Sequence, residues 1–181
     1  MRASSILTII SLVIILQACN QTQQEEKSEK TENIKKMEKP KEMEQVSPEG
    51  YTTFKVSDNI TMYKVNFKNQ YNLNVAGHLF IPKDLDQKQK HAAIIVGHPM
   101  GAVKEQSANV YASNMAERGF ITLSLDLSFW GESDGEPRNV VAPDIYAEDF
   151  SAAVDFLGTR PFVDRERIGI IGVCGSGSFT I

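Results

Sequence analysis

Three apolar segments constrain the fold most strongly. Residues Ala92–Val96 are apolar without alternation, as in a strand covered on both faces, and 120–128 and 167–173 also read as strands. Between them, 107–120 and 144–157 repeat apolar residues on one helical face. The order strand, helix, strand, helix, strand predicts a parallel sheet with helices on both sides. The fold class is therefore predicted to be α/β.

Two further segments precede this pattern. Residues 62–67 and 73–82 alternate apolar and polar side chains, and Pro82 ends the second segment. Such alternation predicts two antiparallel strands. We expect the folded domain to cover residues 51–181.

The chain begins with a pattern typical of an export signal. Arg2 precedes a mainly apolar run, Ile6–Leu16, which is too short to span a bilayer as a stable helix. Leu16–Cys19 resembles the lipobox of bacterial lipoproteins. The resemblance implies removal of residues 1–18, acylation of Cys19, and a membrane-anchored lipoprotein of the cell envelope. Residues 19–50 are rich in Glu, Lys and Gln, which predicts a disordered charged tether.

Composition excludes several functions. The net charge of −4 and the pI near 5.4 argue against nucleic-acid binding. The two cysteines, Cys19 and Cys174, lie in such different contexts that a disulfide is not expected. No cluster of His, Cys and carboxylate residues has metal-ligand spacing, so we predict neither a metal site nor a cofactor.

The clearest chemical motif lies near the carboxyl end of the sequence. Gly172-Val173-Cys174-Gly175-Ser176 follows a predicted strand and matches the nucleophile elbow Gly-x-Ser-x-Gly, with cysteine as the nucleophile. Functional groups gather at the carboxyl ends of parallel strands. A helix starting at this point would favour the reactive thiolate through its dipole. Cys174 is thus the candidate catalytic residue.

Three longer stretches resemble the α/β-hydrolase superfamily, specifically its dienelactone-hydrolase-like and Xaa-Pro-dipeptidyl-peptidase-like branches. They are VGHPMG, SLDLSFWGESDGEPR and PFVDRERIGIIGVCGSG. The resemblance implies a hydrolase that acts on an ester, thioester or related acyl bond of a small molecule. It also implies that the backbone N–H groups of Met100 and Gly175 form the oxyanion hole.

The histidines do not fit the superfamily pattern. In that pattern the acid and then the histidine follow the nucleophile, whereas His78, His91 and His98 all precede Cys174. We expect His98 to stabilise its loop and assign no role to the other two. The chain is therefore expected to be the amino-terminal part of a hydrolase and inactive alone, because it lacks a general base.

Two alternatives remain open at this point. GSGSFT weakly resembles the dinucleotide fingerprint Gly-x-Gly-x-x-Gly, which would make the domain nucleotide-binding. In the other alternative, the protein is a non-catalytic envelope lipoprotein that uses the fold for binding. Separately, the motif also fits a Cys174 that is only a small buried residue at a tight turn.

Overall fold

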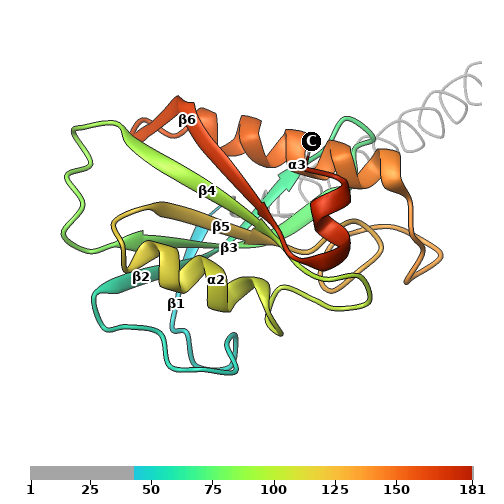
Figure 1. Cartoon of the computed structure of the whole chain (residues 1–181), viewed down its shortest axis with the longest axis horizontal. Coiled ribbons are helices and arrows are strands. Elements are labelled where there is room, and N and C mark those ends of the chain that lie inside the picture. Colours follow the sequence, from blue (N-terminus) through green and yellow to red (C-terminus); the bar gives the residue numbers. More distant parts are fainter. Residues whose placement is uncertain (1–42, 181) are drawn as a thin grey trace, which may run out of the picture. The chain divides into compact units, whose positions relative to one another are not determined.

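A six-stranded mixed sheet with two helices forms the domain (Figure 1). The computed structural model describes residues 43–180. In chain order, the elements are β1 (Met43–Val46), β2 (Ile60–Lys68), β3 (Asn74–Pro82), β4 (His91–Gly97), α2 (Ala108–Ala116), β5 (Ile121–Leu125), α3 (Pro143–Gly158), β6 (Val163–Gly172) and the 3₁₀ helix η1 (Cys174–Ser178).

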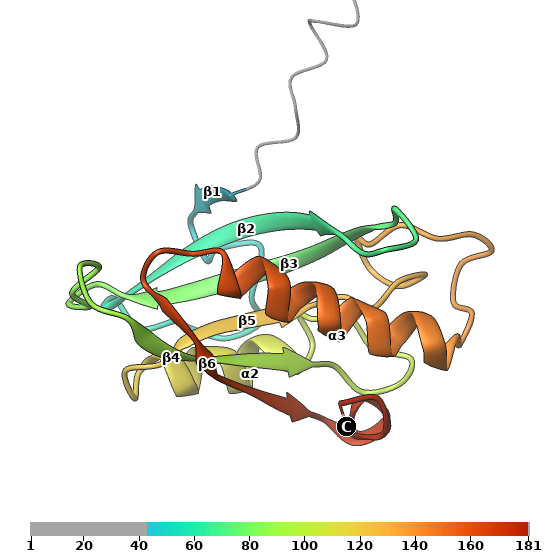
Figure 2. The same ribbon diagram turned by 90° about the horizontal axis from the view of Figure 1, so that it is seen from above.

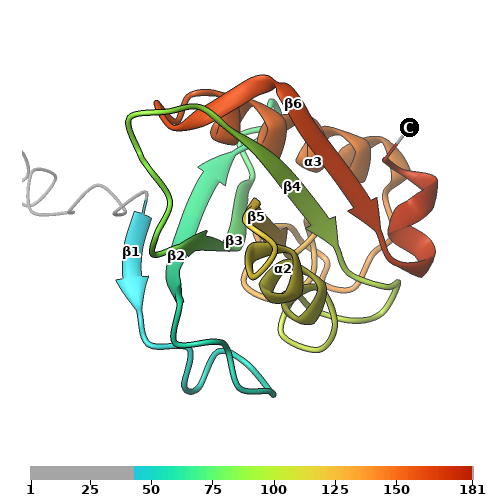
Figure 3. The same cartoon turned by 60° about the vertical axis from the view of Figure 1, so that its left-hand side comes forward.

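The strand order is β1-β2-β3-β5-β4-β6, so β1 and β6 lie at opposite edges of the sheet (Figure 3). The pairs β1–β2, β2–β3 and β3–β5 are antiparallel, whereas β5, β4 and β6 are mutually parallel. In the parallel part, Gly97 at the end of β4 pairs with both Leu125 and Gly172. The carboxyl ends of these three strands are therefore level. The predicted α/β class and the antiparallel strand pair are confirmed.

Two hydrophobic clusters lie on opposite faces of the sheet. The larger one packs α3 against the sheet through Tyr146, Phe150 and Leu157 (Figure 2). The smaller one packs α2 against the other face through three alanines of that helix, Ala108, Ala112 and Ala116. Successive strand residues alternate between the clusters, as with Leu79 and Phe80. Helices cover both faces, as predicted.

The folded domain begins earlier than the sequence indicates. Met43–Val46 form β1 and pair with β2, with Met43 opposite Val65 and Val46 opposite Met62. The prediction of a disordered tether over residues 19–50 is therefore wrong for Met43–Val46. Met43 and Val46 each pack against one hydrophobic cluster, which draws this charged segment into the sheet.

The predicted signal segment 1–18, Cys19 and most of the tether lie outside the described residues. Within residues 43–180, no helix combines the length and apolar character needed to cross a bilayer.

A buried polar network fixes α3 to two loops. Asp149 is fully buried, and its carboxylate accepts hydrogen bonds from the Ser128 backbone N–H at 2.7 Å, the Ser128 hydroxyl at 2.8 Å and the Asn69 side-chain amide at 2.8 Å. Burial raises the pKa of Asp149 to about 6, although these bonds favour its charged form. The network links the β2–β3 turn to the loop after β5.

We predict that Asp149→Ala lowers the free energy of unfolding by about 2 to 4 kcal/mol, because it leaves buried donors without an acceptor. Urea denaturation measures the change. Asp155→Ala in the same helix is the control. Asp155 pairs with Arg165 at the surface, where such ion pairs contribute at most about 1 kcal/mol. Equal losses for the two variants would contradict the prediction.

Candidate active site

The turn after β6 holds Cys174 in an unusual backbone conformation. Its φ is +54°, a region that residues other than glycine seldom adopt, and the residue is exposed. Strained backbone of this kind clusters at functional sites. The exposure contradicts the interpretation of Cys174 as a small buried residue.

The tight turn requires small residues on both sides of Cys174. A Cβ atom on Gly172 would lie 2.5 Å from the Gly177 backbone, and one on Gly97 would lie 2.7 Å from the Ser176 hydroxyl. Ser176 therefore fills the last small-residue position of the motif against β4. Within the described residues, the helix expected after the motif is the five-residue η1. The dipole of so short a helix gives little stabilisation to a thiolate.

The loop after β4 lies beside this turn. A Cβ atom built on Gly175 would be 3.0 Å from the Met100 Cβ and 3.3 Å from the Met100 backbone nitrogen. The backbone N–H groups of Met100 and Gly175 make no hydrogen bond within residues 43–180. The two predicted donors are thus neighbours, each without a partner there.

The His98 side chain connects its own loop, after β4, to the loop after β5 through hydrogen bonds. Its Nδ1 lies 2.7 Å from the Pro99 carbonyl oxygen, and its Nε2 accepts a hydrogen bond from the Leu127 backbone N–H at 3.1 Å. These partners make the imidazole a neutral ring with its proton on Nδ1 and no free lone pair. Burial also lowers its pKa. His98 stabilises its loop, as expected.

The other two histidines are also engaged away from the turn. His91 begins β4, at the opposite end of that strand from Gly97, and its Nε2 lies 2.8 Å from the Asp86 carbonyl oxygen. His78 lies within β3, fully buried, with Nδ1 near the Asn109 side chain. None of the three is placed as a general base for Cys174.

Sequence reasoning missed a buried ion cluster behind the loops. The ammonium group of Lys104 lies 2.6 Å from Asp126, 2.8 Å from Glu105 and 3.0 Å from Glu132, and its side chain is fully buried. Burial alone would lower the pKa of Lys104, but the neighbouring carboxylates outweigh burial and raise it. Asp126 also accepts hydrogen bonds from the backbone N–H groups of Lys104 and Glu132. Asp126 and Glu132 thus shape the loops after β4 and β5.

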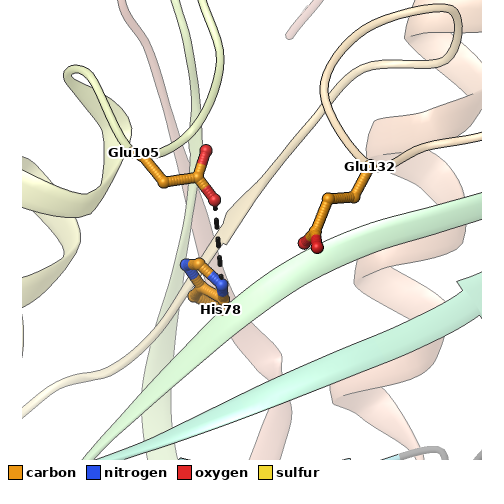
Figure 4. A group of neighbouring side chains, drawn as sticks. All are labelled: His78, Glu105 and Glu132. Carbon is orange, nitrogen blue, oxygen red and sulfur yellow. Dashed lines mark ion pairs between the residues drawn. The ribbon is translucent and has the colours of Figure 1, made fainter. Parts of the chain in front are cut away.

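Part of this cluster has the composition of a metal site. The ligand atoms of His78, Glu105 and Glu132 lie within 4.8 Å of one another (Figure 4), although no metal-ligand spacing is evident in the sequence. However, the Lys104 ammonium contacts both glutamates, and Lys64 makes a second ion pair with Glu132. A cation therefore already occupies the position between the carboxylates, and these residues do not fit a metal ion.

The buried His78 predicts a measurable pH dependence. Burial, followed by the positive charge of Lys104, lowers the pKa of His78 to about 4. The unfolded chain binds a proton below its ordinary value of 6.5 that the folded chain does not bind, so stability falls as the pH decreases from 6.5 towards 4.

We expect the free energy of unfolding to fall with pH in both proteins. Between about pH 7 and about pH 4.5, the fall should be about 2 to 3 kcal/mol smaller in His78→Gln than in the wild type. Urea denaturation at several pH values measures both curves. Groups that titrate in the same window, such as Asp149 and His98, are present in both proteins and cancel in the comparison. Parallel curves would show that His78 does not titrate in this way.

Comparisons with known proteins agree with this arrangement. No protein-family model matches the chain. The uncharacterised protein PA2218 of Pseudomonas aeruginosa is 50% identical over 137 residues, which are 76% of this chain and 37% of that protein. Its crystal structure matches with a TM-score of 0.70 at 51% identity, over 75% of this chain and 42% of that one.

Two fungal proteins are more distant matches. Thiohydrolase aneE of Aspergillus aculeatus is 32% identical over 127 residues, covering 70% of this chain and 38% of that protein. The α/β hydrolase GrgF of a Penicillium species matches with a TM-score of 0.59 at 28% identity, over 66% of this chain and 39% of that one.

A dienelactone hydrolase-like phosphotriesterase, P91, from metagenomic libraries shares the fold at 19% identity, with a TM-score of 0.55 over 67% of this chain and 52% of that one. The chain spans well under half the length of the curated relatives that it matches. The level ends of three parallel strands, the strained cysteine turn after β6 and these relatives lead to one conclusion: the chain belongs to the α/β-hydrolase superfamily.

Proposed function

We propose that the protein hydrolyses an ester, thioester or related acyl bond of a small molecule through a covalent intermediate on Cys174. The observation that carries the proposal is the exposed Cys174, held at a φ of +54° on a turn beside the Met100 backbone. A nucleophile needs this exposure together with a rigid support. The match to thiohydrolase aneE favours a thioester among these bonds.

The proposed chemistry begins with attack of the Cys174 sulfur on the acyl carbon. The negative charge that develops on the carbonyl oxygen is stabilised by the backbone N–H groups of Met100 and Gly175, and the alcohol or thiol leaves. Water then releases the acid from the thioester intermediate. This second step needs a general base, which accelerates proton transfer by roughly 10² to 10⁴.

The histidines of residues 43–180 do not supply that base. Both ring nitrogens of His98 are engaged by Pro99 and Leu127, and His78 is fully buried within β3. We therefore expect the acyl enzyme to form and then to persist in a protein made of this chain alone.

The first test is a reaction with p-nitrophenyl acetate. We expect at most one equivalent of p-nitrophenol in a burst, no steady turnover, and one acetyl group on Cys174 by peptide mass spectrometry. Cys174→Ala should abolish the burst. Cys19→Ser should retain it, which controls for the other cysteine of the chain.

A burst that survives in Cys174→Ala would refute the assignment. Complete failure of wild-type Cys174 to react with acyl donors would instead favour the non-catalytic alternative, a lipoprotein that uses this fold for binding. Sustained turnover that depends on Cys174 would show that another residue acts as the base.

We also propose that Cys19 is lipidated and anchors the protein in the cell envelope. The proposal rests on the apolar run Ile6–Leu16 and on the resemblance of Leu16–Cys19 to a lipobox. Two or more acyl chains give a stable membrane anchor, whereas one chain binds only weakly.

Metabolic labelling in a bacterial host with an alkyne fatty acid tests the anchor. The wild type should carry the label, and Cys19→Ser should lose it because the acylated thiol is absent. Cys174→Ser is the matched control and should keep the label. Equal labelling of wild type and Cys19→Ser would contradict the proposal.

A further inference from the structure

We propose that Ser176 is a positioning residue for acyl transfer: its hydroxyl holds the loop that carries Met100 against the turn that carries Gly175. This inference rests on the proposed function and deepens it. The motif requires only a small residue at this position, and glycine is the usual one. The turn can therefore form without the hydroxyl of Ser176, so its hydrogen bond is an additional contact.

The hydroxyl forms a direct link between two strand ends. Ser176 is 1% exposed, and its Oγ donates a hydrogen bond of 2.5 Å to the carbonyl oxygen of His98. Its backbone N–H donates to the Val173 carbonyl oxygen at 3.3 Å, which fixes the serine within the turn. The bond thus joins the turn after β6 to the loop after β4, across 78 positions of sequence.

The loop side of this link is also well anchored. His98 precedes Met100 by two residues, and its imidazole is held by the Leu127 N–H and the Pro99 carbonyl oxygen. The Ala102 N–H donates to the Pro99 carbonyl oxygen at 3.1 Å and closes a turn around Met100. Ser176 ties this rigid loop to the cysteine turn. Without its hydroxyl, the buried His98 carbonyl oxygen loses that donor.

The relative position of the two segments decides whether both N–H groups reach one oxygen. Oxyanion donors act at about 2.7 to 3.1 Å from the developing charge. A displacement of about 1 Å can reduce a rate by as much as about 100-fold. Met100 and Gly175 belong to different loops, so no covalent constraint maintains their spacing. We infer that the Ser176–His98 bond maintains it.

Two reactions of the same thiol separate positioning from general stability. With p-nitrophenyl acetate, the sulfur bonds to the acetyl carbon, p-nitrophenolate leaves, and the carbonyl oxygen becomes an oxyanion on the way. With iodoacetamide, the sulfur bonds to the methylene carbon and iodide leaves, without any oxyanion. In both reactions the thiol proton passes to the buffer. Only acetylation therefore depends on the two N–H donors.

In the full 181-residue chain carrying Cys19→Ser, we expect Ser176→Ala to slow acetylation of Cys174 by about 10- to 100-fold and to leave alkylation within about two-fold. Ser176→Gly, which has the usual residue at this position, should show the same selective loss and serves if the alanine variant does not fold. Ser178→Ala is the matched control: Ser178 is exposed in the same turn and should leave both rates unchanged.

The ratio of the two rates decides the outcome. If both Ser176 variants slow acetylation and alkylation equally, the hydroxyl has only a structural role and the inference is wrong. Unchanged rates in both variants would also overturn it. If wild-type Cys174 is alkylated but never acetylated, the proposed function itself fails, and the positioning role falls with it.

Discussion

Close packing at Gly97 is the constraint on which the rest of the site depends. A Cβ atom there would lie 2.4 Å from the Phe150 ring of α3 and 2.7 Å from the Ser176 hydroxyl. The missing side chain allows the helix, the end of β4 and the cysteine turn to meet at one point. Because Gly97 also pairs with Leu125 and Gly172, the same residue sets the level at which three loops leave the sheet. A larger residue would separate these segments.

Charge holds the loops in place behind that point. Lys104 and Asp126 are both fully buried, so neither charge is screened by water, and each would be costly to bury without the other. Glu105 and Glu132, whose side chains are partly exposed, are the other two carboxylate partners of the Lys104 ammonium group. On the opposite face, Asp149 holds Ser128 and Asn69. Polar groups therefore fix the loops after β4 and β5, while apolar contacts fix the helices.

The sequence predicted the parts of the structure that have a local signal. The uninterrupted apolar run of β4, the helical period of α3 and the small residues around Cys174 can each be recognised in a few consecutive residues. β1 could not, since only Met43 and Val46 are apolar in a charged segment and their partners lie in β2. The ion cluster escaped prediction for a related reason. Its residues and the neighbouring His78 come from three segments, namely β3 (His78), the loop after β4 (Lys104) and the loop after β5 (Asp126 and Glu132), which only the sheet topology brings together.

The link between Ser176 and His98 has a consequence for how the chain folds. The bond spans 78 positions, and β6 is an edge strand whose neighbour in the sheet is β4. Contacts between residues so far apart in sequence form slowly, because the entropy of closing a long loop must be overcome first. The hairpin of β2 and β3, whose strands are adjacent in the chain, faces no such delay. We therefore expect the cysteine turn to form late in folding, so that a reactive Cys174 would report that β4 and β6 are already paired.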